Sequence, residues 1–169
     1  MAVNNRGRCY VSGPGSALTT YHRGLGREHA KLFANCGSDV LPTRAAYLYY
    51  ERNHYSFLHH DAASAHITLI TGLSEKLSPL LLFPNFGRAS QADIDELNQI
   101  PNEPLDGFCR IMMEVFGDRG LSIQVPVTFG VTLALPGRAI AHARTAQSHH
   151  GAIATTCYSF ITPPEDFLL

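Results

Sequence analysis

Short runs of apolar and β-branched residues, separated by turn residues, recur along most of the chain. The run 65–73 (AHITLITGL) is apolar and β-branched, which is typical of a buried strand. The aromatic run 44–52 (RAAYLYYER) and the short run 80–84 (LLLFP) also have strand character, and 53–57 (NHYSF) indicates a turn that leads into a strand. The first half of the chain is therefore predicted to be mainly β.

The pattern becomes helical after residue 85. Ser90 is a suitable N-cap for a helix over 90–100 (SQADIDELNQI), whose first turn carries acidic residues. Apolar residues then recur at helical spacing over 103–120. Strand-like runs return afterwards, so the helical segments are predicted to form an insert between two sets of strands. The later runs are 121–136, 137–145 and 153–163.

The N-terminal part of the chain carries weaker signals. Residues 1–20 are rich in Gly, Ser, Pro and Asn, and we expect a flexible arm there. The segment 26–37 (GREHAKLFANCG) predicts a short helix that stops at Gly37. The predicted organisation is an arm with a short helix over 1–43, followed by a core over 44–169 with a helical insert at about 88–120.

The order of these elements indicates the fold class. The sequence shows no βαβ repeat and no glycine-rich phosphate loop. Short strands with turn residues between them favour an antiparallel sandwich or a jelly-roll barrel. For a chain of 169 residues, we expect one mainly β domain.

Composition narrows the range of functions. A formal net charge of −1 argues against nucleic acid or an anionic membrane as the main partner. The four cysteines are dispersed and form no CxxC motif, which argues against a zinc knuckle and fits a reducing compartment. The sequence shows no secretory signal and no apolar run of transmembrane length, so we expect a cytoplasmic location.

One polar cluster interrupts the strand pattern, at His59-His60-Asp61. Alternate residues of a strand face the same side, so His59 and Asp61 are expected to point together and His60 away from them. An imidazole and a carboxylate on one face supply two ligands of a 2-His-1-carboxylate site, which leaves open positions on Fe(II). The third ligand is expected to be a histidine far along the chain.

Two segments around these residues resemble a known enzyme family. The stretch 47–84 (YLYYERNHYSFLHHDAASAHITLITGLSEKLSPLLLFP) resembles the core of the Fe(II)/2-oxoglutarate-dependent oxygenases, in their isopenicillin-N-synthase-like and prolyl-hydroxylase-like branches. The stretch 133–164 (LALPGRAIAHARTAQSHHGAIATTCYSFITPP) resembles their closing strands. The helical segment 88–120 has no counterpart, and 1–43 is shorter than the usual N-terminal region of these enzymes.

The resemblance implies a double-stranded β-helix (jelly-roll) core and a non-haem Fe(II) oxygenase. Such an enzyme uses 2-oxoglutarate and O₂ to hydroxylate, desaturate or cyclise a small-molecule or peptide substrate. Carried onto this chain, the metal ligands are His59 and Asp61 with a distal histidine. His142 fits the distal position best by chain length, and His150 and His149 remain alternatives.

The cosubstrate residues depart from the family pattern. These enzymes normally hold the distal carboxylate of 2-oxoglutarate with an arginine on the last strand, but here that strand carries Thr155 and Thr156 and no Arg or Lys. Arg144 shares a face with His142 on a regular strand, so we assign it this role, with Tyr49 and Thr156 as further cosubstrate contacts. An enzyme that does not use 2-oxoglutarate is an alternative. The other candidate cations are Arg138, Arg88 and Lys76.

Two other functions compete with this interpretation. The missing last-strand arginine favours a degenerate jelly roll that acts as a binding or scaffold module. The histidines also suit a cupin-like zinc metalloprotein.

Overall fold

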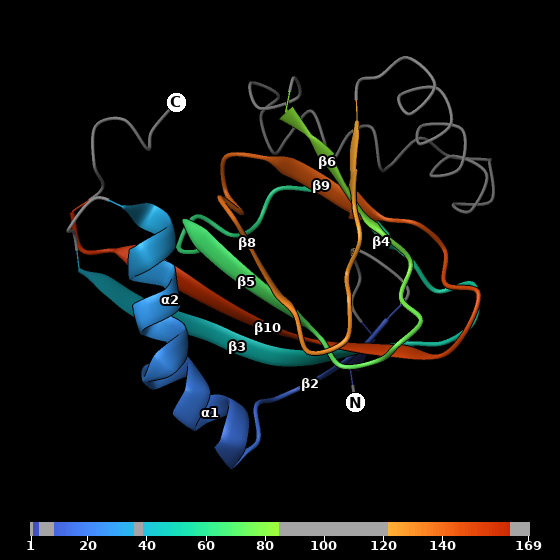
Figure 1. Ribbon diagram of the computed structural model, residues 1–169, viewed down its shortest axis with the longest axis horizontal. Helices are drawn as coiled ribbons and strands as arrows, with labels where there is room; N and C mark the ends of the chain where they lie inside the picture. Colours follow the sequence, from blue (N-terminus) through green and yellow to red (C-terminus); the bar gives the residue numbers. More distant parts are fainter. Residues whose placement is uncertain (1, 4–8, 36–38, 85–121, 163–169) are drawn as a thin grey trace.

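The computed structural model describes residues 2–3, 9–35, 39–84 and 122–162 as two facing antiparallel sheets with two helices (Figure 1). The larger sheet has six strands in the order β1-β2-β3-β10-β5-β8, and the smaller has four in the order β4-β9-β6-β7. The helices are α1 (Ser16–Arg23) and α2 (Leu25–Ala34). The strands of the larger sheet are β1 (Ala2–Val3), β2 (Tyr10–Ser12), β3 (Val40–Tyr50), β5 (Ile67–Gly72), β8 (Thr132–Leu135) and β10 (Gly151–Phe160). Those of the smaller sheet are β4 (Ser56–His59), β6 (Leu80–Phe83), β7 (Ile123–Val125) and β9 (Ala141–Arg144).

Strand β10 lies at the centre of the larger sheet. It pairs with β3 over its whole length, from Gly151 opposite Tyr50 to Phe160 opposite Val40, and with β5 on its other side. Because both neighbours fix its register, β10 presents alternate side chains to opposite faces of the sheet. One face looks toward the smaller sheet, and the other is covered by the helices (Figure 1).

Each face of the larger sheet has its own apolar cluster. Between the sheets, Tyr50, Ile70, Leu80 and Ile153 pack together with further apolar side chains. On the helix side, a second cluster joins α2 to the sheet; its buried members are Ala30, Val40, Ile67, Leu69, Tyr158 and Phe160. This double coverage explains why the runs for β3, β5 and β10 are apolar on both faces rather than strictly alternating.

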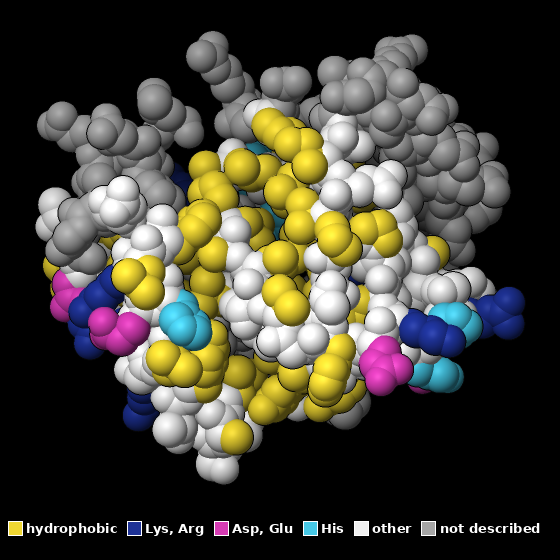
Figure 2. Space-filling model, viewed as in Figure 1, with side chains coloured by type: hydrophobic (Ala, Val, Ile, Leu, Met, Phe, Trp, Pro, Cys, Tyr) yellow, Lys and Arg dark blue, Asp and Glu magenta, His cyan; other side chains and the backbone are white. Residues whose placement is uncertain are grey.

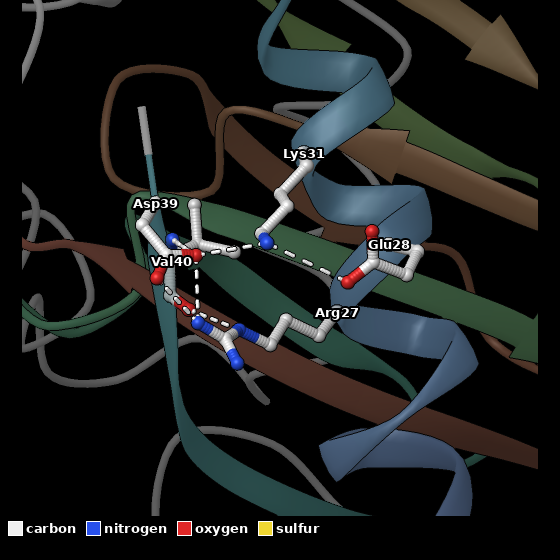
Figure 3. A network of polar contacts seen from close by, with 5 residues as sticks. All are labelled: Arg27, Glu28, Lys31, Asp39 and Val40. Atoms are coloured by element: carbon white, nitrogen blue, oxygen red, sulfur yellow. Dashed lines mark hydrogen bonds and ion pairs between the residues drawn. The ribbon is translucent and has the colours of Figure 1, made fainter. Parts of the chain in front are cut away.

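Helix α2 is fixed to the start of β3 by a polar network (Figure 3). Arg27 Nη2 lies 2.6 Å from both carboxylate oxygens of Asp39, and Arg27 Nε donates to the Val40 carbonyl at 2.8 Å. Lys31 Nζ lies 3.0 Å from Asp39 Oδ1 and 3.5 Å from Glu28 Oε1. On the buried side of the helix, Gly26 allows close packing, because a Cβ there would overlap the hydroxyl of Tyr158.

The antiparallel, mainly β architecture confirms the predicted fold class. The predicted strands over 65–73 and 80–84 are β5 and β6, and the predicted helix over 26–37 is α2. The helical insert at about 88–120 lies outside the described residues. None of the helices in the described ranges is long and apolar enough to span a membrane.

The N-terminal region differs from the expected flexible arm. Within residues 1–20, β2 extends the larger sheet by pairing with β3, with Tyr10 opposite Tyr49 and Val11 opposite Leu48. Helix α1 follows and packs against β3, with Leu18 and His22 buried at a spacing of one helical turn. Strand β3 itself begins at Val40, ahead of the predicted core boundary at residue 44. Apolar side chains therefore place this region on the sheet.

Apolar side chains occupy the middle of the face shown in Figure 2, while charged side chains lie toward its margins. Exposed large apolar residues in the described part of the chain include Phe129 and Val131, which both lie just before β8. Singly exposed apolar residues are ordinary for a folded domain and carry no functional argument here.

Candidate metal centre and cleft

Three candidate ligands meet at the smaller sheet. His59 ends β4 and lies directly opposite His142 of the neighbouring strand β9, and Asp61 follows two residues after His59. Asp61 Oδ1 lies 3.8 Å from His59 Nε2 and 3.7 Å from His142 Nε2. The ligand atoms of all three residues lie within 4.8 Å of one another. The structure thus brings the three predicted metal ligands together.

Both histidine rings are held in one tautomer. His59 Nδ1 lies 2.6 Å from the Phe57 carbonyl oxygen, and His142 Nδ1 lies 2.9 Å from the Ile140 carbonyl oxygen. A carbonyl oxygen only accepts, so each Nδ1 must carry the proton and donate it. In a neutral ring the lone pair is then on Nε2, which is the atom that faces Asp61. Ligating histidines are commonly oriented in this way.

The two carboxylate oxygens of Asp61 face different neighbours. Its Oδ1 faces the two histidines, and its Oδ2 accepts a hydrogen bond of 2.5 Å from Thr68 Oγ1. Burial acts to raise the pKa of Asp61, but the neighbouring histidines and the Thr68 hydroxyl outweigh it and hold that pKa below its ordinary value. The group is therefore an ionised ligand at neutral pH.

A cleft between the two sheets opens beside this cluster, with about 620 Å³ of empty space including its solvent-open part. Its apolar lining comes from Leu48, Ile70, Leu80 and Ile153. Among the described residues that line the cleft, Asp61 is the only acidic one. The cleft therefore combines a candidate metal centre with a lining that is partly apolar and partly polar.

Arg144 is the fully buried cation of the cleft. It lies on β9 two residues after His142 and is 1% exposed. Its Nη1 donates to the Ser78 carbonyl at 2.7 Å, and the guanidinium carbon lies 5.5 Å from the centroid of the Tyr50 ring. Its Nη2 is buried and has no hydrogen-bond partner among the described residues. An unsatisfied donor on a buried cation is costly, so Nη2 is a donor that could receive an anionic acceptor.

Tyr50 lines the cleft beside Arg144. Burial raises the pKa of Tyr50 to about 12, although the guanidinium of Arg144 opposes that rise. The hydroxyl therefore keeps its proton at neutral pH and can donate it. Ser78, which accepts from Arg144, is fixed in turn by Gln147, whose Nε2 donates to Ser78 Oγ at 2.6 Å and whose Oε1 accepts from Ser78 N at 3.0 Å.

A second arginine, Arg44, lines the cleft on the side of the larger sheet. It lies on β3 directly opposite Cys157 of β10 and is exposed to solvent. Burial raises the pKa of Cys157 to about 11, and the positive charge of Arg44 opposes that rise. The same charge helps to lower the pKa of Asp61. The Cys157 thiol is therefore protonated at neutral pH.

Comparison with known proteins supports this architecture. No model of a protein family matches the chain, and no curated protein matches it. A prolyl-4-hydroxylase from Pseudomonas putida superposes with a TM-score of 0.53 at 12% identity, over 90% of this chain and 71% of that chain. The non-heme alpha ketoglutarate dependent epimerase SnoN from nogalamycin biosynthesis gives 0.62 at 13% identity, over 92% of this chain and 65% of that chain.

A third structure, a prolyl hydroxylase from Trichoplax adhaerens solved with a hypoxia inducible factor peptide, superposes with a TM-score of 0.55 at 13% identity. The superposition covers 92% of this chain and 65% of that chain. The chain has the fold of the 2OG-Fe(II) oxygenases. It spans 65% to 71% of the length of these three structures.

Two predicted cosubstrate residues, Tyr49 and Thr156, do not line the cleft. Tyr49 points away from the cleft and contacts Tyr47, with ring centroids 6.4 Å apart, while Tyr50 lines the cleft. Thr156 is buried on the helix side, while Thr155 lines the cleft. Neighbouring side chains of a strand face opposite ways, so the residue next to each predicted one faces the cleft instead.

The alternative ligands and cations lie elsewhere. His149 and His150 are exposed, and His150 lines a separate surface groove with Tyr10 and Tyr49. Arg138 is exposed with its Nη1 3.4 Å from His66, and Lys76 is exposed. Arg88 lies outside the described residues. Of the predicted cations that lie in the described ranges, Arg144 is the one that lines the cleft.

Sequence reasoning missed three residues of the site: Thr68, Gly137 and Arg44. Each lies on or beside a predicted strand, but hydroxyl, glycine and surface cation positions are too common for spacing alone to single them out. Thr68 lies on the run ITLIT that follows the predicted ligand pair, which was the one available signal.

Proposed function

We propose that this protein is a non-haem Fe(II)-dependent oxygenase that uses 2-oxoglutarate and O₂ to hydroxylate, desaturate or cyclise a small-molecule or peptide substrate. The observation that carries the proposal is the convergence of His59, Asp61 and His142 within 4.8 Å, with the Nδ1 atom of each histidine bonded to a carbonyl. Two imidazoles and one carboxylate are the donor set suited to Fe(II) with open positions.

The residues present fit this metal. His59 and His142 would bind it through Nε2, and Asp61 through Oδ1. When bound there, iron with 2-oxoglutarate supplies the oxidising chemistry: the cosubstrate is converted to succinate and CO₂, one atom of O₂ enters succinate, and the other is available for a substrate C–H bond. The chain itself supplies the ligands, their orientation and a partly closed cleft.

Arg144 supports the use of 2-oxoglutarate. Its unpaired Nη2 and its 1% exposure leave a buried positive charge that a carboxylate would satisfy with a charge-assisted hydrogen bond. Tyr50 lies beside it with a proton to donate, and the apolar lining from Leu48 and Ile153 suits the methylene groups of the cosubstrate. In this proposal the missing last-strand arginine is replaced by Arg144 from strand β9 of the facing sheet, and Tyr50 takes the role that the sequence assigned to Tyr49.

The proposal is tested by anaerobic titration of the metal-free protein with Fe(II), followed by 2-oxoglutarate. We expect one Fe(II) per chain and, after the keto acid is added, the visible charge-transfer absorption of an iron–keto acid chelate. On exposure to air, succinate should accumulate even without a substrate. Tight Zn²⁺ binding without 2-oxoglutarate turnover would support the cupin-like alternative. Absence of any metal binding would support a scaffold module.

A further inference from the structure

Thr68 and Gly137 lie against Oδ2 of Asp61, the carboxylate oxygen that is turned away from the two histidines. We propose that Thr68 and Gly137 are positioning residues that keep Asp61 a one-oxygen ligand, with Oδ1 toward the metal and Oδ2 turned away. This inference rests on the proposed metal site. It concerns how many coordination positions of the metal the three protein ligands would fill.

Thr68 supplies a donor from a rigid position. It lies on β5, which is paired on both sides, with Cys157 of β10 opposite it on one side and Leu135 of β8 on the other. The residue is 3% exposed, and its hydroxyl donates to Asp61 Oδ2 at 2.5 Å. Because the strand on which it sits is fixed, the hydroxyl holds the carboxylate in one rotation rather than following it.

Gly137 provides the space in which this hydrogen bond forms. Its carbonyl accepts the Asp61 backbone N–H at 2.9 Å, which brings the β8–β9 turn directly over the carboxylate. A Cβ at position 137 would overlap both Asp61 Oδ2 and Thr68 Oγ1. The glycine is therefore needed for close approach rather than for an unusual backbone conformation.

The consequence is a count of coordination positions. With His59, His142 and one oxygen of Asp61 as its protein ligands, a six-coordinate ion would keep three positions open, which a chelating keto acid and O₂ could use. A carboxylate free to bind through both oxygens would take one of those three. The hydrogen bond from Thr68 to Oδ2 opposes that rotation, so Thr68 and Gly137 act on the open positions without contacting the metal.

The test compares Thr68→Val, which removes the hydroxyl at nearly constant shape, with Thr68→Ser, which keeps it. Thr71→Val is the matched control, because Thr71 lies on the same strand and its hydroxyl pairs with Thr132 at 2.8 Å, away from the cleft. Metal-free proteins are titrated with Co²⁺, and the visible Co²⁺ absorption is recorded before and after 2-oxoglutarate is added. Thermal melts confirm that each variant is folded.

We expect Thr68→Val to lose about 10- to 100-fold in Co²⁺ affinity and to change the Co²⁺ spectrum, the usual size of effect for a partner that orients a ligand. Thr68→Ser should retain most of the affinity, and Thr71→Val all of it. Gly137→Ala should reproduce the loss with Thr68 intact, and it provides the test if Thr68→Val does not fold.

The two proposals fail in different ways. Folded Thr68→Val and Gly137→Ala proteins with wild-type Co²⁺ affinity and spectrum would overturn the positioning role and leave the oxygenase proposal standing. A wild-type protein that binds neither Co²⁺ nor Fe(II) would overturn the metal site and the positioning role together.

Discussion

His59 and His142 lie directly opposite each other across the antiparallel pair of β4 and β9, with their ring centroids 4.3 Å apart. The smaller sheet thus fixes the separation of two ligands that are far apart in the sequence. Replacing either histidine should remove metal binding without unfolding the domain, because neither ring is part of the main apolar clusters.

We therefore predict that His142→Ala lowers Fe(II) affinity by at least about 100-fold, because one of three protein ligands is lost. His150→Ala is the matched control, since His150 is exposed and outside the cleft, and it should bind Fe(II) like the wild type. Anaerobic titration followed by metal analysis measures both. Equal losses in the two variants would contradict the assignment of His142.

Arg144→Met should weaken 2-oxoglutarate binding by at least about 10-fold while Fe(II) binding persists, because the proposed carboxylate partner is removed and the ligands remain. Arg138→Met is the control, since Arg138 is exposed. The measurement is the thermal shift caused by 2-oxoglutarate on Fe(II)-loaded protein, which reports binding to the folded state. A wild-type shift in Arg144→Met would rule out this role.

The stability of Arg144→Met without ligands is informative as well. Loss of the bond to the Ser78 carbonyl is unfavourable, but removal of a buried guanidinium with an unpaired Nη2 is favourable. We expect the metal-free variant to unfold at a temperature close to that of the wild type. A large fall in the midpoint would indicate that Arg144 serves mainly to support the fold.

Tyr50 should contribute to an alkaline loss of stability. Its pKa is about 12 in the folded protein against 10.0 for the free side chain, so between pH 10 and 12 the unfolded chain loses this proton first. The protonated hydroxyl contributes its full stabilisation below pH 10, and about 3 kcal/mol of that stability is lost as pH rises through the folded value. Urea unfolding of Tyr50→Phe at a series of pH values should show a shallower alkaline decline than the wild type.

Removing the Asp39 carboxylate should loosen the junction of α2 and β3. Asp39→Asn weakens the contacts with Arg27 and Lys31, so its melting midpoint should fall at low salt. These groups are exposed, and the difference from the wild type should shrink in about 1 M NaCl as the ion pairs are screened. A salt-independent difference would show that packing rather than charge is involved.

The sequence allowed the meeting of His59, Asp61 and His142 to be predicted better than their surroundings. His59 and Asp61 were paired by the two-residue spacing of a strand, and His142 by the chain length needed for the last strand. Both arguments depend only on the number of residues between two positions in the sequence. The position of Arg144 followed from its spacing to His142 in the same way, and the structure places both residues on β9 and in the cleft.

The phase of two strands was not predictable in this way. The run Tyr47–Tyr50 and the pair Thr155 and Thr156 offer similar side chains to both faces, so no alternation of apolar and polar residues marks the cleft side. The larger sheet is packed on one face by the smaller sheet and on the other by helices, which removes that signal. Strand β2 was missed because it has three residues and follows a segment rich in turn residues.

The bonds that orient the two rings have a further consequence. Each imidazole is held by the carbonyl two residues earlier in the chain, that of Phe57 for His59 and that of Ile140 for His142. The orientation of each ring is thus set in part within a tripeptide of the chain. An arriving ion would then meet donors already turned toward it, and its capture would require little rearrangement of the protein.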